Sequence, residues 1–475
     1  MITKQEILDL SQEWQLRPGI VEKDYIIGWL LWGISNNLRL SDSWVFKGGT
    51  CLKKCFIETY RFSEDLDFTV LPDGPVRALE ISRILSDLLQ FVADSSGINF
   101  SIQQPKLKDR PNGYSTEVRV YYQGPLQART PASVKFDLTK KEDVIQPPVL
   151  QAITHPYSDE FPEYSQNGVR CYGLEEVFAE KIRALGERCR PRDLYDVIML
   201  YRRPDLRLAP DPILSVLERK CKSKQISVPT YESIMNSPSL DELKGEWKNM
   251  LVHQLPALPP IASFLDELEN VFKWLHGELE PIVLEAISAD EMDIDTHWTP
   301  PPTVWKWGQG VPLEAVRFAG ANRLCINLTY KGTVRRIEPY SLRRSSIGRI
   351  LLYARKSETG EIRAYRVDRI EGVEVSTQPF TPKYKVEFTP TGPLSSPKLT
   401  RRPSGLVEWY SAGRLRPRRH TATRMGPTYV IECPYCYKKF RRSKRNFTLN
   451  KHKDQSGYSI CLGSGRRGYL IDTIY

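Results

Sequence analysis

The sequence predicts an α+β protein in which a large mixed domain is followed by a small β-barrel and a zinc-finger-like tail. Residues 1–280 alternate between helical spacing of apolar residues and short strand-like runs. Residues 313–390 contain evenly spaced strand-like runs, and residues 429–475 contain a compact group of cysteines and a histidine. The length of 475 residues also exceeds what one hydrophobic core usually accommodates.

Composition and charge limit the class of protein. With 40% hydrophobic and 26% charged residues, most of the chain is expected to fold, and no apolar run is long enough to span a bilayer. The nine cysteines are odd in number and scattered, and the N-terminus does not resemble a secretory signal. We therefore expect a cytoplasmic protein with no membrane association.

The net charge of +11 is concentrated at the C-terminal end. Residues 391–475 carry 18 Lys and Arg against 4 Asp and Glu, so the rest of the chain is slightly acidic. Such a basic segment either keeps the protein soluble or attracts a polyanion, and we favour nucleic acid as its partner.

The elements of the first domain follow from the spacing of apolar residues. Helices are expected at 4–14, 20–38, 52–58 and 75–95, and from Leu174 onward with an interruption at Pro191. Strands are expected at 44–47, 66–71, 98–103, 115–122 and 132–138. Residues 281–312, rich in Pro, Trp and Gly, are interpreted as a linker, and residues 391–428 as a second, basic linker.

The segment VFKGGTCLKKCFIETYRFSEDLDFTV, residues 45–70, is the most informative. Gly48 and Gly49 follow a strand and open a helix, a turn that lets backbone N–H groups approach a triphosphate. Asp65 and Asp67 lie two residues apart in a strand and point to one face. Together with Asp137 on another strand, they would form a two-metal site.

The strings GGTCLKK and RFSEDLDF resemble the AbiEii/AbiGii-type toxin nucleotidyltransferases, a branch of the DNA polymerase β superfamily. Residues 174–200 resemble the family's E-x-x-A-x-K helix and R-D-x-x-D-L element, and VEKDY resembles its first helix. The matching positions are Glu22, Lys23, Asp24, Glu176, Ala179, Lys181, Arg192, Asp193 and Asp196. The resemblance covers about residues 5–275 and implies a polymerase-β-like domain with a helical C-terminal part.

The resemblance implies metal-dependent transfer of NMP from an NTP to an RNA, above all the 3′ end of tRNA. It also implies a toxin or phage-defence (abortive infection) effector with a neutralising antitoxin or another defence-system partner. Asp65, Asp67 and Asp137 would bind Mg²⁺ or Mn²⁺, Lys181 would contact the triphosphate, and Asp193 would organise the pocket. The implied nucleotide-binding residues are Gly48, Gly49, Thr50, Lys53 and Arg192. For Arg192, Asp193 and Asp196 the alternative is an interhelical ion-pair cluster.

Residues 313–390 resemble a WYL domain, an SH3-like barrel that senses nucleic-acid ligands. The resemblance rests on RRIEPYSL (335–342), RILLYARK (349–356) and YRVDRI (365–370), with Leu351-Leu352-Tyr353 in place of the Trp-Tyr-Leu tripeptide. It implies that Tyr353, Arg366 and Arg369 contact nucleic acid; the alternative is a barrel used only for packing.

The tail contains the pattern C-x2-C-x15-H-x8-C, whose four ligands suit tetrahedral Zn²⁺. The four ligands are Cys433, Cys436, His452 and Cys461. We interpret this zinc as structural, and the alternative is that His452 and Cys461 are incidental. Four basic residues of the same segment are expected to contact a nucleic-acid backbone: Arg441, Arg442, Lys444 and Arg445.

Two other functions stay open at this point. One is a nucleic-acid-binding regulator whose transferase domain is inactive, although retention of the clustered acids and Lys181 argues against it. The other is an enzyme that places the nucleotide on a protein hydroxyl, against which the basic tail favours RNA.

Overall fold

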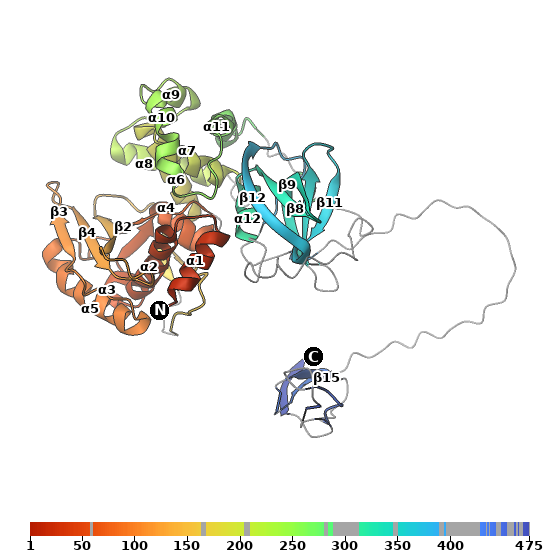
Figure 1. Cartoon of the computed structure of the whole chain (residues 1–475). Helices are drawn as coiled ribbons and strands as arrows, with labels where there is room; N and C mark the ends of the chain where they lie inside the picture. Colours follow the sequence, from red (N-terminus) through yellow and green to blue (C-terminus); the bar gives the residue numbers. More distant parts are fainter. Residues whose placement is uncertain are drawn as a thin grey trace. The chain divides into compact units, whose positions relative to one another are not determined.

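The structure is a computed structural model. It describes residues 1–57, 60–162, 168–203, 210–279, 284–287, 313–344, 350–388, 394–395, 428–433, 435–436, 438–442, 448–453, 460–461, 464 and 469–474. The chain forms two compact units, Met1–Leu399 and Thr400–Tyr475 (Figure 1). The expected linkers, 281–312 and 391–428, lie almost entirely outside the described residues.

A seven-stranded mixed sheet organises the first part of the chain. Its strands are β1 (Trp44–Lys47), β2 (Asp65–Val70), β3 (Lys106–Asp109), β4 (Ser115–Tyr122), β5 (Ala132–Thr139), β6 (Val149–Gln151) and β7 (Val169–Cys171). The order is β3-β4-β5-β2-β1-β7-β6. Because β2 pairs antiparallel with β1 and parallel with β5, it lies at the centre of the sheet.

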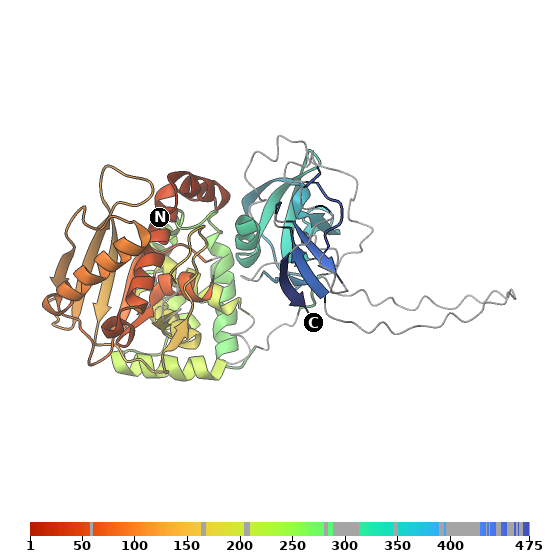
Figure 2. The same ribbon diagram turned by 90° about the horizontal axis from the view of Figure 1, so that it is seen from below.

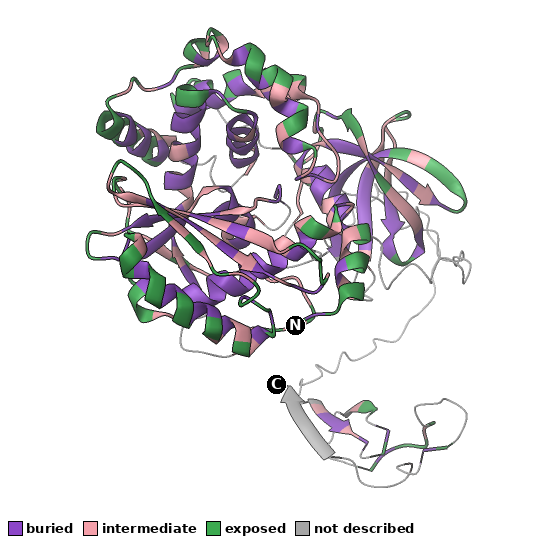
Figure 3. Cartoon of the chain, turned by 60° about the vertical axis from the view of Figure 1, so that its left-hand side comes forward, coloured by how far each residue is buried: buried purple, intermediate pink, exposed green. Residues whose placement is uncertain are grey.

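Two helices cover one face of this sheet. Helix α2 (Pro18–Ser35) has proline at its first position and is apolar on all sides, so it is buried almost throughout, as Figure 3 shows. Helix α5 (Ala78–Ser96) begins where Glu80 accepts two backbone N–H groups and ends at Gly97, whose φ is +76°. Short helices α1 (Lys4–Glu13) and α3 (Leu38–Ser41) flank α2.

The following helices form a second layer (Figure 2). They are α6 (Leu174–Arg188), α7 (Pro191–Tyr201), α8 (Pro210–Lys224), α9 (Tyr231–Met235), α10 (Leu240–Leu251) and α11 (Ile261–Leu275). Their apolar faces share one core, which continues into α12 (Leu313–Ala321) and the strands after it.

In the barrel region, mainly antiparallel strands form a curved sheet with the order β11-β10-β9-β8-β12. The strands are β8 (Leu324–Tyr330), β9 (Thr333–Arg344), β10 (Ile350–Lys356), β11 (Ile362–Arg366) and β12 (Ile370–Pro379), with β13 (Leu394–Ser395) parallel to β9. A 3₁₀ turn, η4 (Val367–Arg369), separates β11 from β12. The tail forms a three-stranded sheet from β14 (Thr428–Glu432), β15 (Lys439–Arg442) and β16 (Tyr469–Ile474).

One expected element is wrong, and another has different bounds. Residues 98–103 form a turn with one isolated bridge, Asn99–Gln123, because the Asn99 side chain accepts the backbone N–H of Ser101 and bends the chain. The helix expected at 52–58 starts earlier, as α4 (Gly48–Cys51), and continues as a π-helical turn, η1 (Leu52–Phe56).

None of the helices in the described part of the chain combines the length and apolar character needed to cross a membrane.

Candidate active site

A row of charged residues crosses the sheet on the face away from α2 and α5. Lys47 of β1 pairs in register with Asp67 of β2, which in turn pairs with Asp137 of β5. Glu117 of β4 continues the row beside Asp137. Residues in register point to the same face, and Asp65, two residues before Asp67, points the same way. The structure thus brings the three predicted acids together.

These carboxylates are difficult to ionise together. Burial raises the pKa of Asp65 and of Asp67, and the negative charge of Asp137 adds to both shifts. Asp137 is held by Lys135 Nζ at 2.6 Å and Arg110 Nη2 at 2.9 Å. Clustered carboxylate oxygens are the donors that hard divalent cations take, so this set fits a divalent metal ion.

The Gly-Gly turn leads from β1 to the edge of this acid group. Gly48 has a φ of +83°, and a Cβ atom there would collide with the Asp67 carboxylate. A Cβ atom at Gly49 would lie 2.6 Å from Arg61 Nη2. The position of Gly48 therefore requires glycine, a side chain at Gly49 would displace the Arg61 guanidinium, and the backbone of the turn lies against Asp67 and Arg61.

Thr50 and Lys53, predicted to bind the nucleotide, lie beneath the turn. Thr50 is buried, and its hydroxyl donates to the backbone carbonyl of Asp65, which ties α4 to β2. Lys53 is 5% exposed, with Nζ 4.3 Å from the centroid of the Phe62 ring. Neither residue belongs to the lining of the cleft beside the acids.

The predicted Lys181 lies on α6, opposite the sheet. Its Nζ is 2.7 Å from Asp196 Oδ2 and 3.9 Å from Asp193 Oδ1. Arg61 Nε and Nη2 each lie 2.7 Å from an Asp196 oxygen. Although burial opposes its ionisation, Arg61 and Lys181 hold the pKa of Asp196 well below its usual range. Asp196 therefore links the Gly-Gly turn to the helical wall.

Asp193 and Arg192 are not paired with each other. Asp193 is fully buried and accepts two hydrogen bonds from Arg188, at 2.6 and 2.8 Å, a partner that the sequence did not indicate. Arg192 Nε is buried and has no hydrogen-bond partner within the described ranges. Burial, and then the nearby Arg61 charge, lower the pKa of Arg192. Its Nε is thus a buried donor left for a ligand, although Arg192 is not among the residues that line the cleft.

A cleft of about 1060 Å³ lies between the acid row and helices α6 and α8. Four predicted residues line it: Gly48, Asp67, Asp137 and Lys181. Charged lining residues that sequence reasoning missed are Lys47, Arg110, Lys140, Lys141, Glu142, Asp143, Glu180, Arg183, Arg188 and Lys224. The position of Lys47 directly before Gly48 was the one available signal for it.

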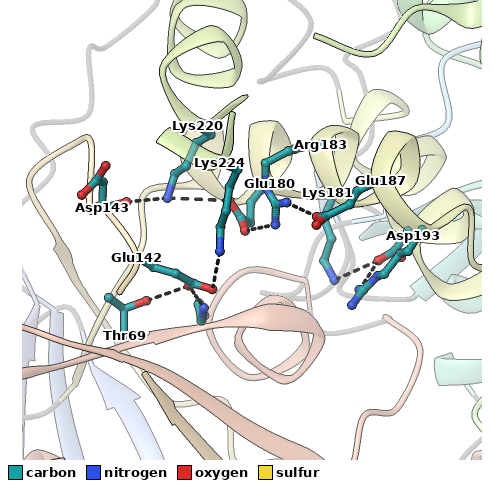
Figure 4. A network of polar contacts seen from close by, with 12 residues as sticks. Thr69, Glu142, Asp143, Glu180, Lys181, Arg183, Glu187, Asp193, Lys220 and Lys224 are labelled. Atoms are coloured by element: carbon teal, nitrogen blue, oxygen red, sulfur yellow. Dashed lines mark hydrogen bonds and ion pairs between the residues drawn. The ribbon is translucent and has the colours of Figure 1, made fainter. Parts of the chain in front are cut away.

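A polar network connects the sheet to the helical wall (Figure 4). Glu142 contacts Lys47 Nζ, accepts the Thr69 hydroxyl at 3.3 Å and lies 4.0 Å from Lys224 Nζ. Burial lowers the pKa of Lys47 to about 8, against the pull of nearby acids such as Glu180. The cleft therefore has acids on its floor and cations around it, a combination suited to a metal-bound polyphosphate.

The predicted nucleic-acid contacts of the barrel region are mostly buried. Arg366 Nε and Nη2 donate to Asp368 at 3.0 and 2.5 Å, whereas its Nη1 is buried without a partner in the described structure. Arg369 is 6% exposed, and Tyr353 lies in an apolar cluster with Tyr340 and Phe380. Tyr353 can stack on a base only if this cluster opens.

The four predicted ligands of the tail converge. All of their ligand atoms lie within 4.8 Å of one another, and the Sγ atoms of Cys433 and Cys461 are 3.7 Å apart. His452 Nδ1 is 2.7 Å from the carbonyl oxygen of Asn450. The side chains of Arg441 and Arg442, and all of Lys444 and Arg445, lie outside the described residues.

The chain is similar to known toxins over most of its described length. Residues 29–274 match the family model of the nucleotidyl transferase AbiEii toxin of type IV toxin–antitoxin systems, and residues 313–375 match that of the WYL domain. MenT4, a nucleotidyltransferase toxin from Mycobacterium tuberculosis H37Rv, is 21% identical. The alignment covers 59% of this chain and 91% of that one, with a TM-score of 0.40. None of the curated proteins matches the sequence.

The first family model spans more than half of the chain. It confirms the expected nucleotidyltransferase domain, and the second model confirms the expected WYL domain. Such a transferase uses an NTP and a divalent metal ion, which the carboxylates and the basic cleft fit. The chain belongs to the nucleotidyl transferase AbiEii toxin family and carries a WYL domain after its transferase domain.

Proposed function

We propose that this toxin transfers NMP from an NTP to an RNA acceptor, above all the 3′ end of tRNA. The observation that carries the proposal is the in-register pair Asp67 and Asp137, with Asp65 alongside, on the floor of a cation-lined cleft. These three acids would hold Mg²⁺, which would neutralise the triphosphate and activate the acceptor hydroxyl.

The residues of the chain would position the nucleotide. The backbone N–H groups of the Gly48–Gly49 turn, at the N-terminus of α4, would approach the phosphates. Lys181 and Arg192 supply positive charge from the opposite wall, and Arg192 has a buried Nε ready to donate. Asp193 acts indirectly, since it fixes Arg188 at the junction of α6 and α7.

The rim of the cleft suits a nucleic-acid backbone. Arg110 and Lys141 are exposed at the cleft, next to Asp137, whose side chain is 31% exposed. Basic side chains in such positions bind phosphates without reading sequence, which would orient the terminal hydroxyl of an RNA toward the acids. The basic segment 391–475 would add affinity.

The C-terminal parts would recruit or sense RNA. In the barrel region the candidate contacts are Tyr353, Arg366 and Arg369, and in the tail they are Arg441, Arg442, Lys444 and Arg445. A physiological role in phage defence, with a neutralising antitoxin, follows from the family alone and belongs to the same proposal.

Structural zinc would hold the tail together. His452 directs a buried Nε2, which lacks a hydrogen-bond partner among the described residues, toward Cys433, Cys436 and Cys461. Its other ring nitrogen faces a backbone carbonyl, the usual orientation of a zinc-bound histidine. Elemental analysis should find one zinc per chain, lost in Cys433→Ser. No zinc in the purified full chain would contradict this site.

The function is tested by incubating the full chain with each α-labelled NTP, Mg²⁺ and total RNA. Label should enter a tRNA-sized band and fall at least about 100-fold in Asp65→Ala/Asp67→Ala, because metal binding contributes several kcal/mol to the transition state. Asp73→Ala, an exposed acid just after β2, is the matched control. Label in protein instead of RNA would identify a protein hydroxyl as acceptor. No label in either fraction would identify a regulator with an inactive transferase domain.

A further inference from the structure

Three cysteines converge beneath the Gly-Gly turn. Cys51 ends α4, Cys55 lies in the π-helical turn η1, and Cys171 ends β7, which pairs with β1. Their sulfur atoms all lie within 4.8 Å of one another. Cys51 and Cys171 are fully buried, whereas Cys55 is partly exposed. No step of the proposed nucleotidyl transfer uses these thiols.

We propose that Cys51, Cys55 and Cys171 form a binding site for one thiophilic cation of the Cu(I) type. Around a single ion with metal–sulfur bonds of about 2.3 Å, three sulfurs in a plane lie about 4 Å apart, which is within the observed limit. Soft thiolate donors select such ions over hard cations. Each coordinating thiol gives its proton to solvent, and the ion keeps its oxidation state.

The number of ligands favours Cu(I) over Zn²⁺. In the described structure, no fourth His, Cys, Asp or Glu joins the three sulfurs. Structural Zn²⁺ is almost always held by four ligands, as in the tail, whereas Cu(I) is satisfied by three sulfurs. A disulfide would use only two of the three thiols and would leave the convergence of the third unexplained.

The local backbone supports the assignment. The backbone N–H of Ile57 donates to the carbonyl of Leu52 at 2.7 Å, five residues back, so the helix is widened where Cys55 faces Cys171. Such π-helical turns are frequent at functional sites. An ion at the three sulfurs would fasten α4 and η1 to β7, directly below the Gly48–Gly49 turn.

The test uses the full chain carrying Cys433→Ser/Cys436→Ser/Cys461→Ser, so that no thiol of the tail site can contribute. Anaerobic titration with Cu(I) against a chromophoric chelator should show one bound equivalent. Cys55→Ser changes the least buried ligand and should weaken binding at least tenfold. Cys221→Ser, which changes a buried cysteine of α8 outside the group, should leave the affinity unchanged. X-ray absorption of the copper-loaded protein should count three sulfur neighbours, a readout that does not depend on a variant folding.

Three results would overturn the proposal. The first is an equal Cu(I) affinity after all three cysteines are replaced by serine. The second is preferential uptake of Zn²⁺ by the three cysteines in the same competition. The third is disulfide formation on exposure to peroxide, detected as a mass loss of two hydrogens, in a protein whose reduced form binds no Cu(I). This result would identify a redox-active pair of thiols instead of a metal site.

Discussion

Arg61 joins the two sides of the candidate active site through one guanidinium. It pairs with Asp196, donates to Gln254 Oε1 at 3.0 Å and packs on the backbone of Gly49. Asp196 also binds Lys181, so the Gly-Gly turn and the helical wall share one buried contact. We therefore assign Arg61 as a positioning residue, although it does not line the cleft.

Replacement of Arg61 by lysine should distinguish the effect of its positive charge from the effect of its hydrogen-bond geometry. Arg61→Lys keeps the positive charge but loses the paired hydrogen bonds, each worth roughly 1.5–3 kcal/mol when charged and buried. We expect a lower melting temperature and a transfer rate reduced by about tenfold to 100-fold. Arg39→Lys, at an exposed position, is the control. Unchanged kcat and KM in Arg61→Lys would show that the contact is only structural.

His155 should make the protein sensitive to mild acid. Burial lowers its pKa, although Asp159 pulls in the opposite direction at 3.0 Å. Because the folded state then binds fewer protons than the unfolded state, stability should fall as the pH drops below about 6.5. Thermal melting between pH 7 and pH 5 should show this fall, and His155→Gln should reduce it. The exposed His276→Gln should melt like the parent protein at every pH.

The sequence predicted which side chains lie together only where the residues are close to one another in the chain. Asp65 and Asp67 share a face because they are two residues apart in a strand, and the glycines open helix α4. The pairing of Asp137 with Asp67 depends on a parallel contact between distant strands, which spacing does not fix. The Arg188 partner of Asp193 depends on how α6 turns into α7.

Helix α7 contacts both the candidate active site and the barrel region. Asp196 faces Lys181 and Arg61, whereas the preceding Tyr195 donates its hydroxyl to Asn322 at 2.9 Å, beside the barrel region. Arg323 and Arg202 share Glu267 of α11, each at 2.7 Å. Because these groups are buried or nearly so, the helical layer and the barrel region are held by specific polar contacts as well as by a common apolar core.

The Tyr195–Asn322 contact can be measured by a double-mutant cycle. Tyr195→Phe and Asn322→Ala should each lower the free energy of unfolding, since each leaves a buried polar partner without its hydrogen bond, at roughly 1–3 kcal/mol. The double variant should lose less than the sum of the two. Chemical denaturation of the full chain checks this. Strict additivity would mean that the two side chains do not interact.

Elements with a clear apolar pattern were predictable, and short strands without one were not. The strand at 115–122 matches β4 because its apolar residues alternate clearly, and the strand at 44–47 matches β1, a short apolar run that ends at the Gly-Gly turn. The strands β3, β6 and β7 were missed because they are short and, unlike β1, contain no run of several consecutive apolar aromatic or aliphatic residues. Residues 98–103 alternate as a strand would, yet the Asn99 turn interrupts them.

At the scale of the whole molecule, charge separates the basic C-terminal segment from the slightly acidic remainder. Under the proposed function, the transferase domain would contact RNA through its local basic rim, whereas residues 391–475 would attract it through the excess of 18 positive over 4 negative groups. Binding through such charge releases counterions and weakens as salt rises.

The salt dependence of RNA binding should reveal the contribution of the tail. Fluorescence anisotropy with labelled tRNA should give a linear fall of log K with log salt. Removal of residues 391–475 should lower both the affinity and the slope. Removing the positive charges of Arg110 and Lys141 together should reduce the magnitude of the slope of log K against log salt by roughly one to two. Each phosphate contact contributes about 0.9 to this slope. A slope unaffected by loss of the tail would assign the RNA contact to the cleft alone.

The order in which the strands and helices are synthesised also determines when the candidate active site of this toxin can be completed during translation. Asp65 and Asp67 leave the ribosome early, but β2 has its neighbour Asp137 only after β5 follows, and Lys181 comes later still on α6. At about 5–20 residues per second, Lys181 is made roughly ten seconds after Asp67. A nascent chain thus carries its acids without the opposing wall, so under the proposed function we expect no transfer until the helical layer has emerged and docked.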